Sequence, residues 1–298
     1  MKAKTTSIAV PVLGLFLLLT GCAYHPYVDE ERLDSGLVLV LTGIEGRSWI
    51  NRQIADGLDR GGVDHAIEIV DWTSILGPVY SLRSTQRNRD EAEKIAKRIV
   101  NYRRAHPGKP VYLVGNSGGG GMALWVAEAL PRGQEVDGIV LLAAAISPGY
   151  SLSEAQDHTA QGIVNFYSER DWVMLGAGTS VAGTIDGKHK SSAGRIGFDD
   201  PTDTMQAKAH EDLYQIAWQD DMSQFGHFGG HFTAGTSAYI TRYVAPLIRA
   251  KYWDSQLVER VERGLPIPLK PNSRKEKRGD EWPTGGFDSQ DDWRTNGW

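Results

Sequence analysis

The segment Gly115-Asn116-Ser117-Gly118-Gly119 has the spacing Gly-x-Ser-x-Gly. In this pattern a tight turn between a strand and a helix lifts the serine hydroxyl clear of the sheet, and small neighbours make the turn possible. The context strengthens the motif, because an apolar run at 111–114 precedes it and a helical segment at 122–130 follows. A serine raised in this way can attack a carbonyl carbon if a base removes its proton. Alternatively, Ser117 could cap a helix in an anion-binding turn, although no Gly-Lys-Ser/Thr of a phosphate loop follows.

Strand-like and helix-like segments alternate around this motif. Continuous apolar runs predict strands that are covered on both faces, and apolar residues at helical spacing predict the helices between them. We expect strands at 37–41, 66–70, 111–114, 138–144, 163–167 and 213–218, and helices around 50–58, 92–102, 122–130 and 240–248. This alternation indicates an α/β fold with a mainly parallel, doubly wound sheet. Active sites of such sheets lie at the carboxyl edge, where Ser117 falls.

From residue 37 to about 248, the strand order and the Gly-x-Ser-x-Gly elbow resemble the α/β-hydrolase superfamily. The spans after the elbow are short, which implies a small α/β-hydrolase fold without a large cap domain. The resemblance implies an oxyanion hole formed by the backbone N–H groups of Gly118 and Ile44. Thr42 stands where histidine is common in the family, but the expected donor is a backbone group. The 42–46 segment could also be an ordinary glycine turn between a strand and a helix.

In this family the acid of the triad follows a strand beyond the elbow, and Asp171 follows the predicted strand 163–167 at that place. Its role would be to orient the imidazole and to stabilise the imidazolium. Glu169 is the second candidate. Asp171 could also be a surface residue paired with Arg170.

The base is expected after the last strand, where Phe225-Gly226-His227-Phe228-Gly229-Gly230-His231-Phe232 lies. We favour His231, because the two glycines before it allow a sharp bend into the site. His227 is then either the base itself or a residue that orders the loop. The pair is spaced i and i+4, as in some zinc sites, but the glycines argue against a helix and no glutamate lies between them. No metal site is therefore expected.

The chain begins with two lysines, an apolar stretch over 8–19, and the sequence Leu19-Thr20-Gly21-Cys22. This layout is typical of a secretory signal, and the apolar stretch is too short to span a membrane. The ending resembles a bacterial lipobox, which implies that Cys22, the only cysteine, carries lipid. Ala23 favours the outer membrane of the cell envelope. The alternative is a disordered leader with an idle cysteine.

Composition sets the remaining bounds. The chain has 298 residues, of which 41% are hydrophobic and 23% charged, with a net charge of −5. These values fit one globular domain and give no basic field for nucleic acid. We expect a signal peptide at 1–21, a hydrolase domain at 22–264 and a disordered tail at 265–298, rich in Pro, Gly and charged residues.

Further along, a glycine-rich stretch at 174–201 predicts a long loop over the carboxyl edge. Trp72, Trp172 and Tyr80 could line an apolar pocket there or belong to the core.

The leading hypothesis is hydrolysis of a carboxyl ester through a triad of Ser117, His231 and Asp171, without a cofactor. The substrate would be a small acyl compound, and the lipid anchor would make the membrane the other partner. Acyltransferases, peptidases and thioesterases use the same constellation. A membrane-tethered binding protein without activity is the alternative from another class.

Overall fold

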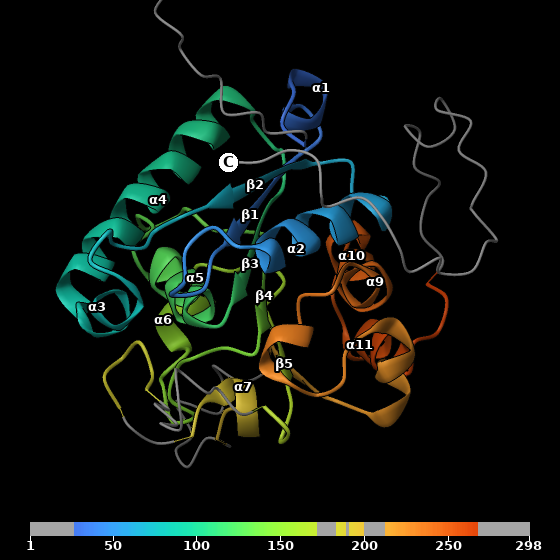
Figure 1. Cartoon of the computed structure of the whole chain (residues 1–298). Coiled ribbons are helices and arrows are strands. Elements are labelled where there is room, and N and C mark those ends of the chain that lie inside the picture. The colour runs from blue at the N-terminus through green and yellow to red at the C-terminus, as the bar shows by residue number, and fades with distance from the viewer. Residues whose placement is uncertain (1–26, 172–182, 189–190, 200–211, 268–298) are drawn as a thin grey trace, which may run out of the picture.

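The computed structural model describes residues 27–171, 183–188, 191–199 and 212–267. Its centre is one sheet of six parallel strands in the order β2-β1-β3-β4-β5-β6 (Figure 1). The strands are β1 (Leu37–Leu41), β2 (Ala66–Val70), β3 (Val111–Asn116), β4 (Gly138–Leu142), β5 (Ile163–Tyr167) and β6 (Leu213–Ala217). The predicted α/β fold with a parallel, doubly wound sheet is confirmed, and no large cap domain is present among the described residues.

Helices cover both faces of the sheet, as Figure 1 shows. The helical segments are α1 (Glu30–Leu33), α2 (Trp49–Arg60), α3 (Pro78–Arg83), α4 (Thr85–Ala105), α5 (Gly118–Glu128), α6 (Ser153–Gln156), α7 (Ala193–Ile196), α9 (Ser237–Tyr239), α10 (Ala245–Arg249) and α11 (Ser255–Glu262). A π-helical segment η3 (Ile240–Val244) joins α9 to α10, and two 3₁₀ segments, η1 (Asp220–Phe225) and η2 (His231–Thr233), follow β6.

Strand β1 shows why the sheet is buried on both sides. All five of its residues are buried, and alternate side chains enter two different cores. Leu39 packs with residues of α4 and α5, whereas Val40 packs with residues of α2, α10 and α11. The long apolar runs of the sequence therefore reflect a sheet enclosed between two helical layers.

The order of the strands also places the site. The chain passes from β1 to β2 on one side, and from β3 onward it continues on the other side of β1. The adjacent carboxyl ends of β1 and β3 therefore form the switch point of the sheet, where loops diverge and leave a crevice for ligands. Ile44 follows β1 and Ser117 follows β3, so both lie at this point.

Four features differ from the sequence-based expectations. Helix α5 begins at Gly118, so residues 118–121, predicted as part of a turn, are helical. The predicted helix 240–248 is interrupted by the π segment. Helices α3 and α11 were not predicted, although Asp254 caps α11 through its side chain. Helix α7 lies within the predicted loop 174–201, much of which is outside the described residues.

Candidate active site

Ser117 occupies a strained turn between β3 and α5. Its φ of 54° and ψ of −121° lie in a region that residues other than glycine rarely adopt. A Cβ on Gly119 would lie 2.2 Å from the carbonyl oxygen of Leu41, and a Cβ on Gly115 would lie 2.3 Å from that of Gly119. The backbone N–H of Ser117 donates to the Leu142 carbonyl at 2.9 Å, which ties the turn to β4. The glycines are thus required by close backbone approach, and the serine is held clear of the sheet.

The hydroxyl of Ser117 forms a hydrogen bond with the ring of His231, which in turn forms hydrogen bonds with the carboxylate of Asp171. The distance from Ser117 Oγ to His231 Nε2 is 2.9 Å, and His231 Nδ1 lies 3.0 Å from both carboxylate oxygens of Asp171. All three residues are buried, with 5–7% of their surface exposed. An ionised carboxylate can only accept, so Nδ1 carries the hydrogen and Nε2 is free to accept the serine proton. The arrangement has the connectivity of a catalytic triad.

Asp171 is held on a tight turn that follows β5. Its backbone N–H donates to the Ser168 carbonyl at 2.8 Å, and its side chain is turned inward to His231. The second candidate, Glu169, is exposed on the same turn. Arg170 does not pair with Asp171: its guanidinium lies 3.3 Å from Asp220 and stacks over Trp218 at 4.3 Å. The structure therefore brings Asp171, and neither neighbour, to the histidine.

His227 is buried and points into a different environment. Its Nδ1 lies 2.9 Å from Thr233 Oγ1, and its ring packs against Tyr239 with centroids 4.6 Å apart. Thr233 Oγ1 donates its one hydrogen to the Gly230 carbonyl at 2.8 Å, so it accepts from His227 Nδ1. Burial lowers the pKa of His227 to about 4, which keeps the ring neutral at neutral pH. His227 thus lies within the hydrogen bonds that order the loop carrying His231.

Two backbone N–H groups lie close together beside Ser117. A Cβ on Gly118 would fall 3.5 Å from the backbone nitrogen of Ile44 and 2.7 Å from its Cγ2. Within the described residues, neither the Ile44 nor the Gly118 N–H has an acceptor in the protein. Two neighbouring backbone N–H groups without an acceptor in the protein can bind an oxyanion.

Trp72 closes this cradle on one side. Its ring carbon Cζ2 would lie 3.2 Å from a Cβ on Gly118, and its indole N–H donates to the Thr42 carbonyl at 2.7 Å. It is fully buried, so it belongs to the core and also bounds the site. Tyr80 is partly exposed, and Trp172 lies outside the described residues.

Sequence reasoning missed the positioning residues Thr233 and Trp218. Thr233 accepts from His227 and from the Phe228 N–H, and the Trp218 indole donates to the His227 carbonyl at 2.7 Å. The signal for Thr233 was its place two residues after His231, since short hydroxyl side chains often tie glycine-rich loops together. No comparable signal marked Trp218.

Metal coordination does not fit the two histidines as they are arranged. Both ring nitrogens of His231 are hydrogen-bonded to the triad partners, and His227 is directed to Thr233. In the part of the chain that the structure describes, no group of three or more His, Cys, Asp or Glu side chains is placed to hold a metal ion.

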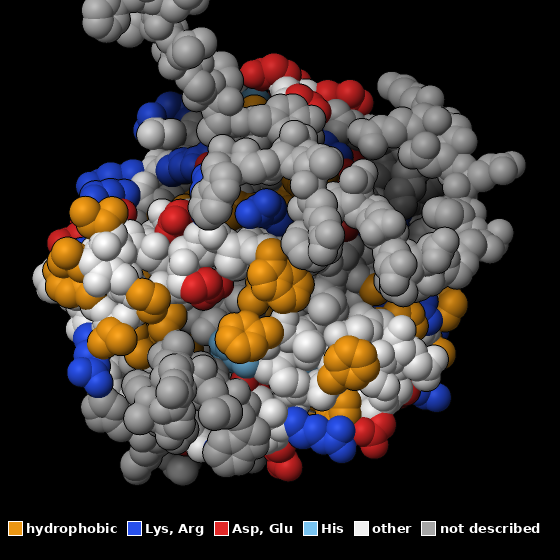
Figure 2. All heavy atoms as spheres, in the orientation of Figure 1, with side chains coloured by type: hydrophobic (Ala, Val, Ile, Leu, Met, Phe, Trp, Pro, Cys, Tyr) orange, Lys and Arg blue, Asp and Glu red, His pale blue; other side chains and the backbone are white. Residues whose placement is uncertain are grey.

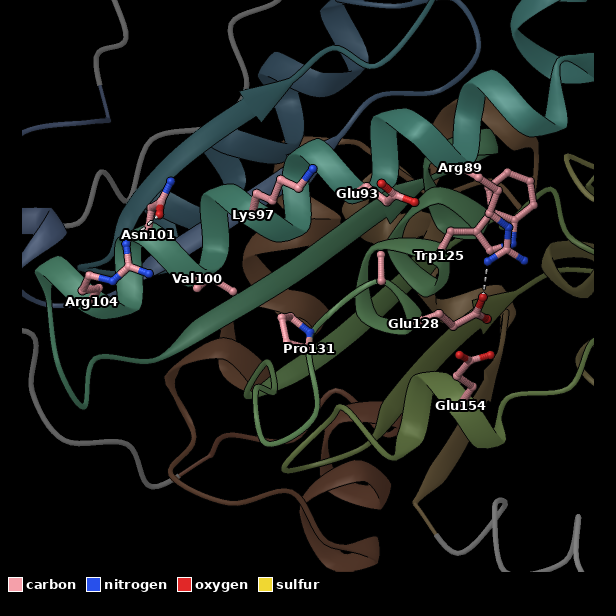
Figure 3. A pocket seen from close by; sticks show the side chains of 11 residues that line it. Arg89, Glu93, Lys97, Val100, Asn101, Arg104, Trp125, Glu128, Pro131 and Glu154 are labelled. Atoms are coloured by element: carbon pink, nitrogen blue, oxygen red, sulfur yellow. Dashed lines mark hydrogen bonds and ion pairs between the residues drawn. The ribbon is translucent and has the colours of Figure 1, made fainter.

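A separate groove of about 640 Å³ lies over α4 and α5 (Figure 3). Among its polar residues, Arg89 binds Glu128 and stacks over Trp125, and Glu128 also accepts from the Tyr150 hydroxyl at 2.7 Å. Burial raises the pKa of Glu128, and hydrogen bonds from Tyr150 and Arg89 oppose that effect. The groove lies on the outer face of the helical layer, away from the triad.

Comparisons with known proteins address the fold. A family model described as alpha/beta hydrolase fold matches residues 36–170. No curated protein sequence matches the chain.

Solved structures similar to the chain include lipase B of Aspergillus fumigatus, with 13% identity, a TM-score of 0.46, and coverage of 80% of this chain and 57% of the lipase. The chain thus spans little more than half of that lipase. A poly(3-hydroxybutyrate) depolymerase from Bordetella parapertussis has 15% identity and a TM-score of 0.41, over 76% of this chain and 83% of the depolymerase. The esterase PE8 has 16% identity and a TM-score of 0.37, over 66% and 85%. The family match and the six-stranded parallel sheet together give this chain an α/β-hydrolase fold.

Proposed function

We propose that the protein is a serine hydrolase that cleaves carboxyl esters, with Ser117 as nucleophile, His231 as general base and Asp171 as the acid that orients it. The observation that carries the proposal is the pair of hydrogen bonds at His231, 2.9 Å to Ser117 and 3.0 Å to Asp171. An imidazole held in this way can take a proton from the serine and return it to a leaving group.

The reaction would proceed in two halves. Ser117 Oγ attacks the carbonyl carbon of the ester while its proton passes to His231 Nε2. The carbonyl electrons move onto oxygen, and the resulting oxyanion accepts hydrogen bonds from the Ile44 and Gly118 N–H groups. Collapse expels the alcohol, which takes the proton from Nε2 and leaves an acyl-serine.

In the second half, water attacks the acyl carbon and gives its proton to Nε2. The second tetrahedral intermediate then expels Ser117 Oγ, which recovers that proton. The carboxylic acid leaves, and the triad returns to its starting state. No cofactor takes part in either half. An acyltransferase would differ only in the acceptor, with an alcohol or amine in place of water.

A fluorophosphonate probe tests the nucleophile directly. We expect the wild-type chain to be labelled covalently at Ser117, because the triad raises the nucleophilicity of this hydroxyl. Ser117→Ala should not be labelled, and peptide mass spectrometry would locate the adduct. A folded wild-type protein that takes up no probe would contradict the proposal and favour a binding protein on a hydrolase fold. Turnover of a panel of esters, thioesters and amides then separates the possible acyl chemistries.

We also propose that the mature protein is anchored in the cell envelope by lipid on Cys22, with the outer membrane favoured by Ala23. This segment lies outside the described residues, so the proposal rests on the lipobox-like sequence. Within the described residues no helix is long and apolar enough to cross a membrane. Intact mass spectrometry is expected to show a chain that begins at Cys22 and carries acyl groups. An uncleaved leader or an unmodified Cys22 would contradict the anchor without affecting the proposed chemistry.

A further inference from the structure

The exposed large hydrophobic side chains are concentrated at one edge of the sheet. Of the ten among the described residues, eight follow the carboxyl ends of strands, as the triad does, and the other two are Tyr252 and Leu265. The eight are Trp49 after β1; Ile75, Leu76, Val79 and Tyr80 after β2; Ile196 after β5; and Phe228 and Phe232 after β6. Figure 2 shows hydrophobic side chains grouped on the viewed face, with a histidine among them. We call the eight residues the apolar rim. Single exposed apolar residues are ordinary, but their concentration on one face indicates a contact surface.

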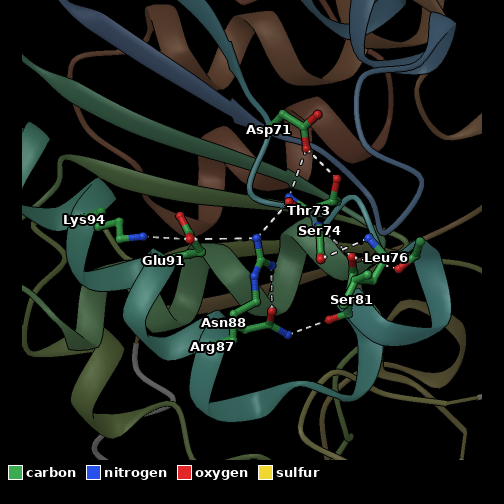
Figure 4. Close-up of polar contacts among 10 residues, drawn as sticks. Asp71, Thr73, Ser74, Leu76, Ser81, Arg87, Asn88, Glu91 and Lys94 are labelled. Atoms are coloured by element: carbon green, nitrogen blue, oxygen red, sulfur yellow. Dashed lines mark hydrogen bonds and ion pairs between the residues drawn. The ribbon is translucent and has the colours of Figure 1, made fainter.

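The part of the rim after β2 is held in place by hydrogen bonds (Figure 4). Asp71 accepts from the N–H and the hydroxyl of Thr73, and Ser81 Oγ accepts from the Ser74 N–H at 2.9 Å. From α4, Arg87 donates to the Thr73 carbonyl at 2.7 Å and Asn88 donates to the Ser81 carbonyl at 2.6 Å.

These bonds fix the segment on which Ile75 and Leu76 stand. The Ile75 side chain is fully exposed and Leu76 is 67% exposed. The polar groups of the segment after β2 are thus hydrogen-bonded within the protein, while its largest apolar side chains are exposed to solvent.

The rest of the rim lies beside the catalytic histidine. The ring of Phe232 is 5.6 Å from that of His231, edge to face, and Phe228 is 64% exposed. Trp49 begins α2 directly after the loop that carries Ile44, and its neighbour Ile50 packs against Gly235 of the histidine loop. A surface that contacts the rim would therefore lie next to the loops that carry the triad.

The two largest parts of the rim carry no formal charge. Segments 73–82 and 222–236 contain no Asp, Glu, Lys or Arg, although such residues make up 23% of the chain. An anionic membrane is usually bound through clusters of basic side chains, and a partner protein through an apolar patch that is surrounded by a polar rim and direct hydrogen bonds. Two uncharged segments with aromatic and aliphatic side chains instead match a neutral lipid surface, where aromatic rings lie at the level of the headgroups.

We propose that the apolar rim binds a neutral lipid surface, so that the loops carrying the triad lie against a layer of apolar molecules. Binding needs no turnover, so this proposal stands or falls separately from the proposed chemistry. The substrates that such a surface would deliver are esters with long apolar chains.

The experiment uses the full chain with Cys22→Ser, which removes the only cysteine and any lipid on it, and with Ser117→Ala to prevent turnover. A single new cysteine, Ile75→Cys or Phe228→Cys, carries an environment-sensitive fluorophore. The matched control is Tyr252→Cys, which is 66% exposed but lies outside the rim. Because each probe reports only its own surroundings, the way in which the N-terminus contacts lipid does not affect the comparison.

With phosphatidylcholine vesicles, we expect blue-shifted emission and quenching by spin-labelled lipid for the probes at 75 and 228, and neither effect for the probe at 252. Leu76→Ser combined with Ile75→Cys should reduce vesicle partitioning of that probe by about tenfold, because burial of one large aliphatic side chain contributes that much or more. Binding should persist at 0.5 M salt.

Equal responses at 75 and 252, or no response at 75 and 228, would overturn the proposal. A response that requires phosphatidylglycerol and disappears in salt would overturn the assignment to a neutral surface. If the vesicles bind this variant but the wild-type protein, which retains Ser117, takes no fluorophosphonate, the binding surface stands and the proposed chemistry falls.

Discussion

Replacement of His231 by alanine is expected to lower kcat for a soluble ester by about four orders of magnitude or more, with little change in KM. The reason is that His231 Nε2, 2.9 Å from Ser117 Oγ, is the group placed to remove the serine proton and to protonate the leaving alcohol. Stopped and continuous assays of released alcohol would measure both constants, and circular dichroism would confirm that the variant is folded.

His227→Ala is the matched control in the same loop. His227 hydrogen-bonds Thr233 and packs against Tyr239, so its loss should loosen the loop and lower kcat by about tenfold. It should also lower stability, because it removes a buried ring and leaves a cavity. If His227→Ala were the more damaging variant for turnover of folded protein, the role of the base would move to His227. Two rates near wild type would rule out the triad.

Asp171→Asn is expected to lower kcat by about two to four orders of magnitude. The asparagine amide can donate to His231 Nδ1, and the imidazole hydrogen would then reside on Nε2. In that tautomer Nε2 cannot accept the Ser117 proton, although the volume of the side chain is almost unchanged. Pre-steady-state release of the first product would show whether acylation is the step that slows.

Glu169→Gln is the control for this variant, since it makes the same chemical change two residues earlier, at an exposed position. Its kcat should stay within about twofold of wild type, because a solvated surface carboxylate contributes little to the site. An equal loss in both variants would show that the charge of the 168–171 turn, and not a hydrogen bond to His231, matters for turnover.

The sheet could be predicted closely from the sequence because burial on both faces leaves a simple pattern. Strands β1, β2 and β5 have the predicted bounds: Leu37–Leu41 is a continuous apolar run, Ala66–Val70 and Ile163–Tyr167 each include one polar residue, and a polar residue follows each strand. The parallel direction of the strands follows from the same alternation of strands and helices.

The start of α5 was mispredicted because four consecutive glycines have a low helix propensity. Packing overrides that preference here. A Cβ on Gly119 would collide with the end of β1, and one on Gly121 would lie 2.3 Å from Ile185 Cγ2. Such contacts between distant segments are not visible in a local pattern. The π segment at 240–244 depends on hydrogen-bond register, which side-chain periodicity does not report.

The site residues and their expected pairing were predicted from motif and chain order, but the structural reason that they meet was not. Ser117, Asp171 and His231 lie on three loops, and the ladder of neighbouring strands brings those loops together. The preference for His231 over His227 rested on the glycines at 229 and 230. What distinguishes the two rings in the structure is Thr233, which engages His227 and leaves His231 to face Ser117.

The place where the N-terminal segment joins the domain has a consequence for orientation. The backbone carbonyl of Tyr27 accepts a hydrogen bond from the Ile67 N–H at 3.0 Å, and the Arg32 side chain of α1 donates to the carbonyl of His65, just before β2. In Figure 1, α1 lies at one end of β1 and β2 and α3 lies at the other, so the chain enters at the amino edge, opposite the triad.

Four residues separate Cys22 from Tyr27, and the five residue steps between them reach about 18 Å at most in a fully extended chain. A folded domain of this size is about 45 Å across. A lipid at Cys22 would therefore anchor the molecule at the amino edge of the sheet, and the carboxyl edge with the triad would point away from the anchoring membrane. The leaflet that holds the anchor would then not supply the substrate. Hydrolysis would act on lipid that reaches the protein from the opposite side.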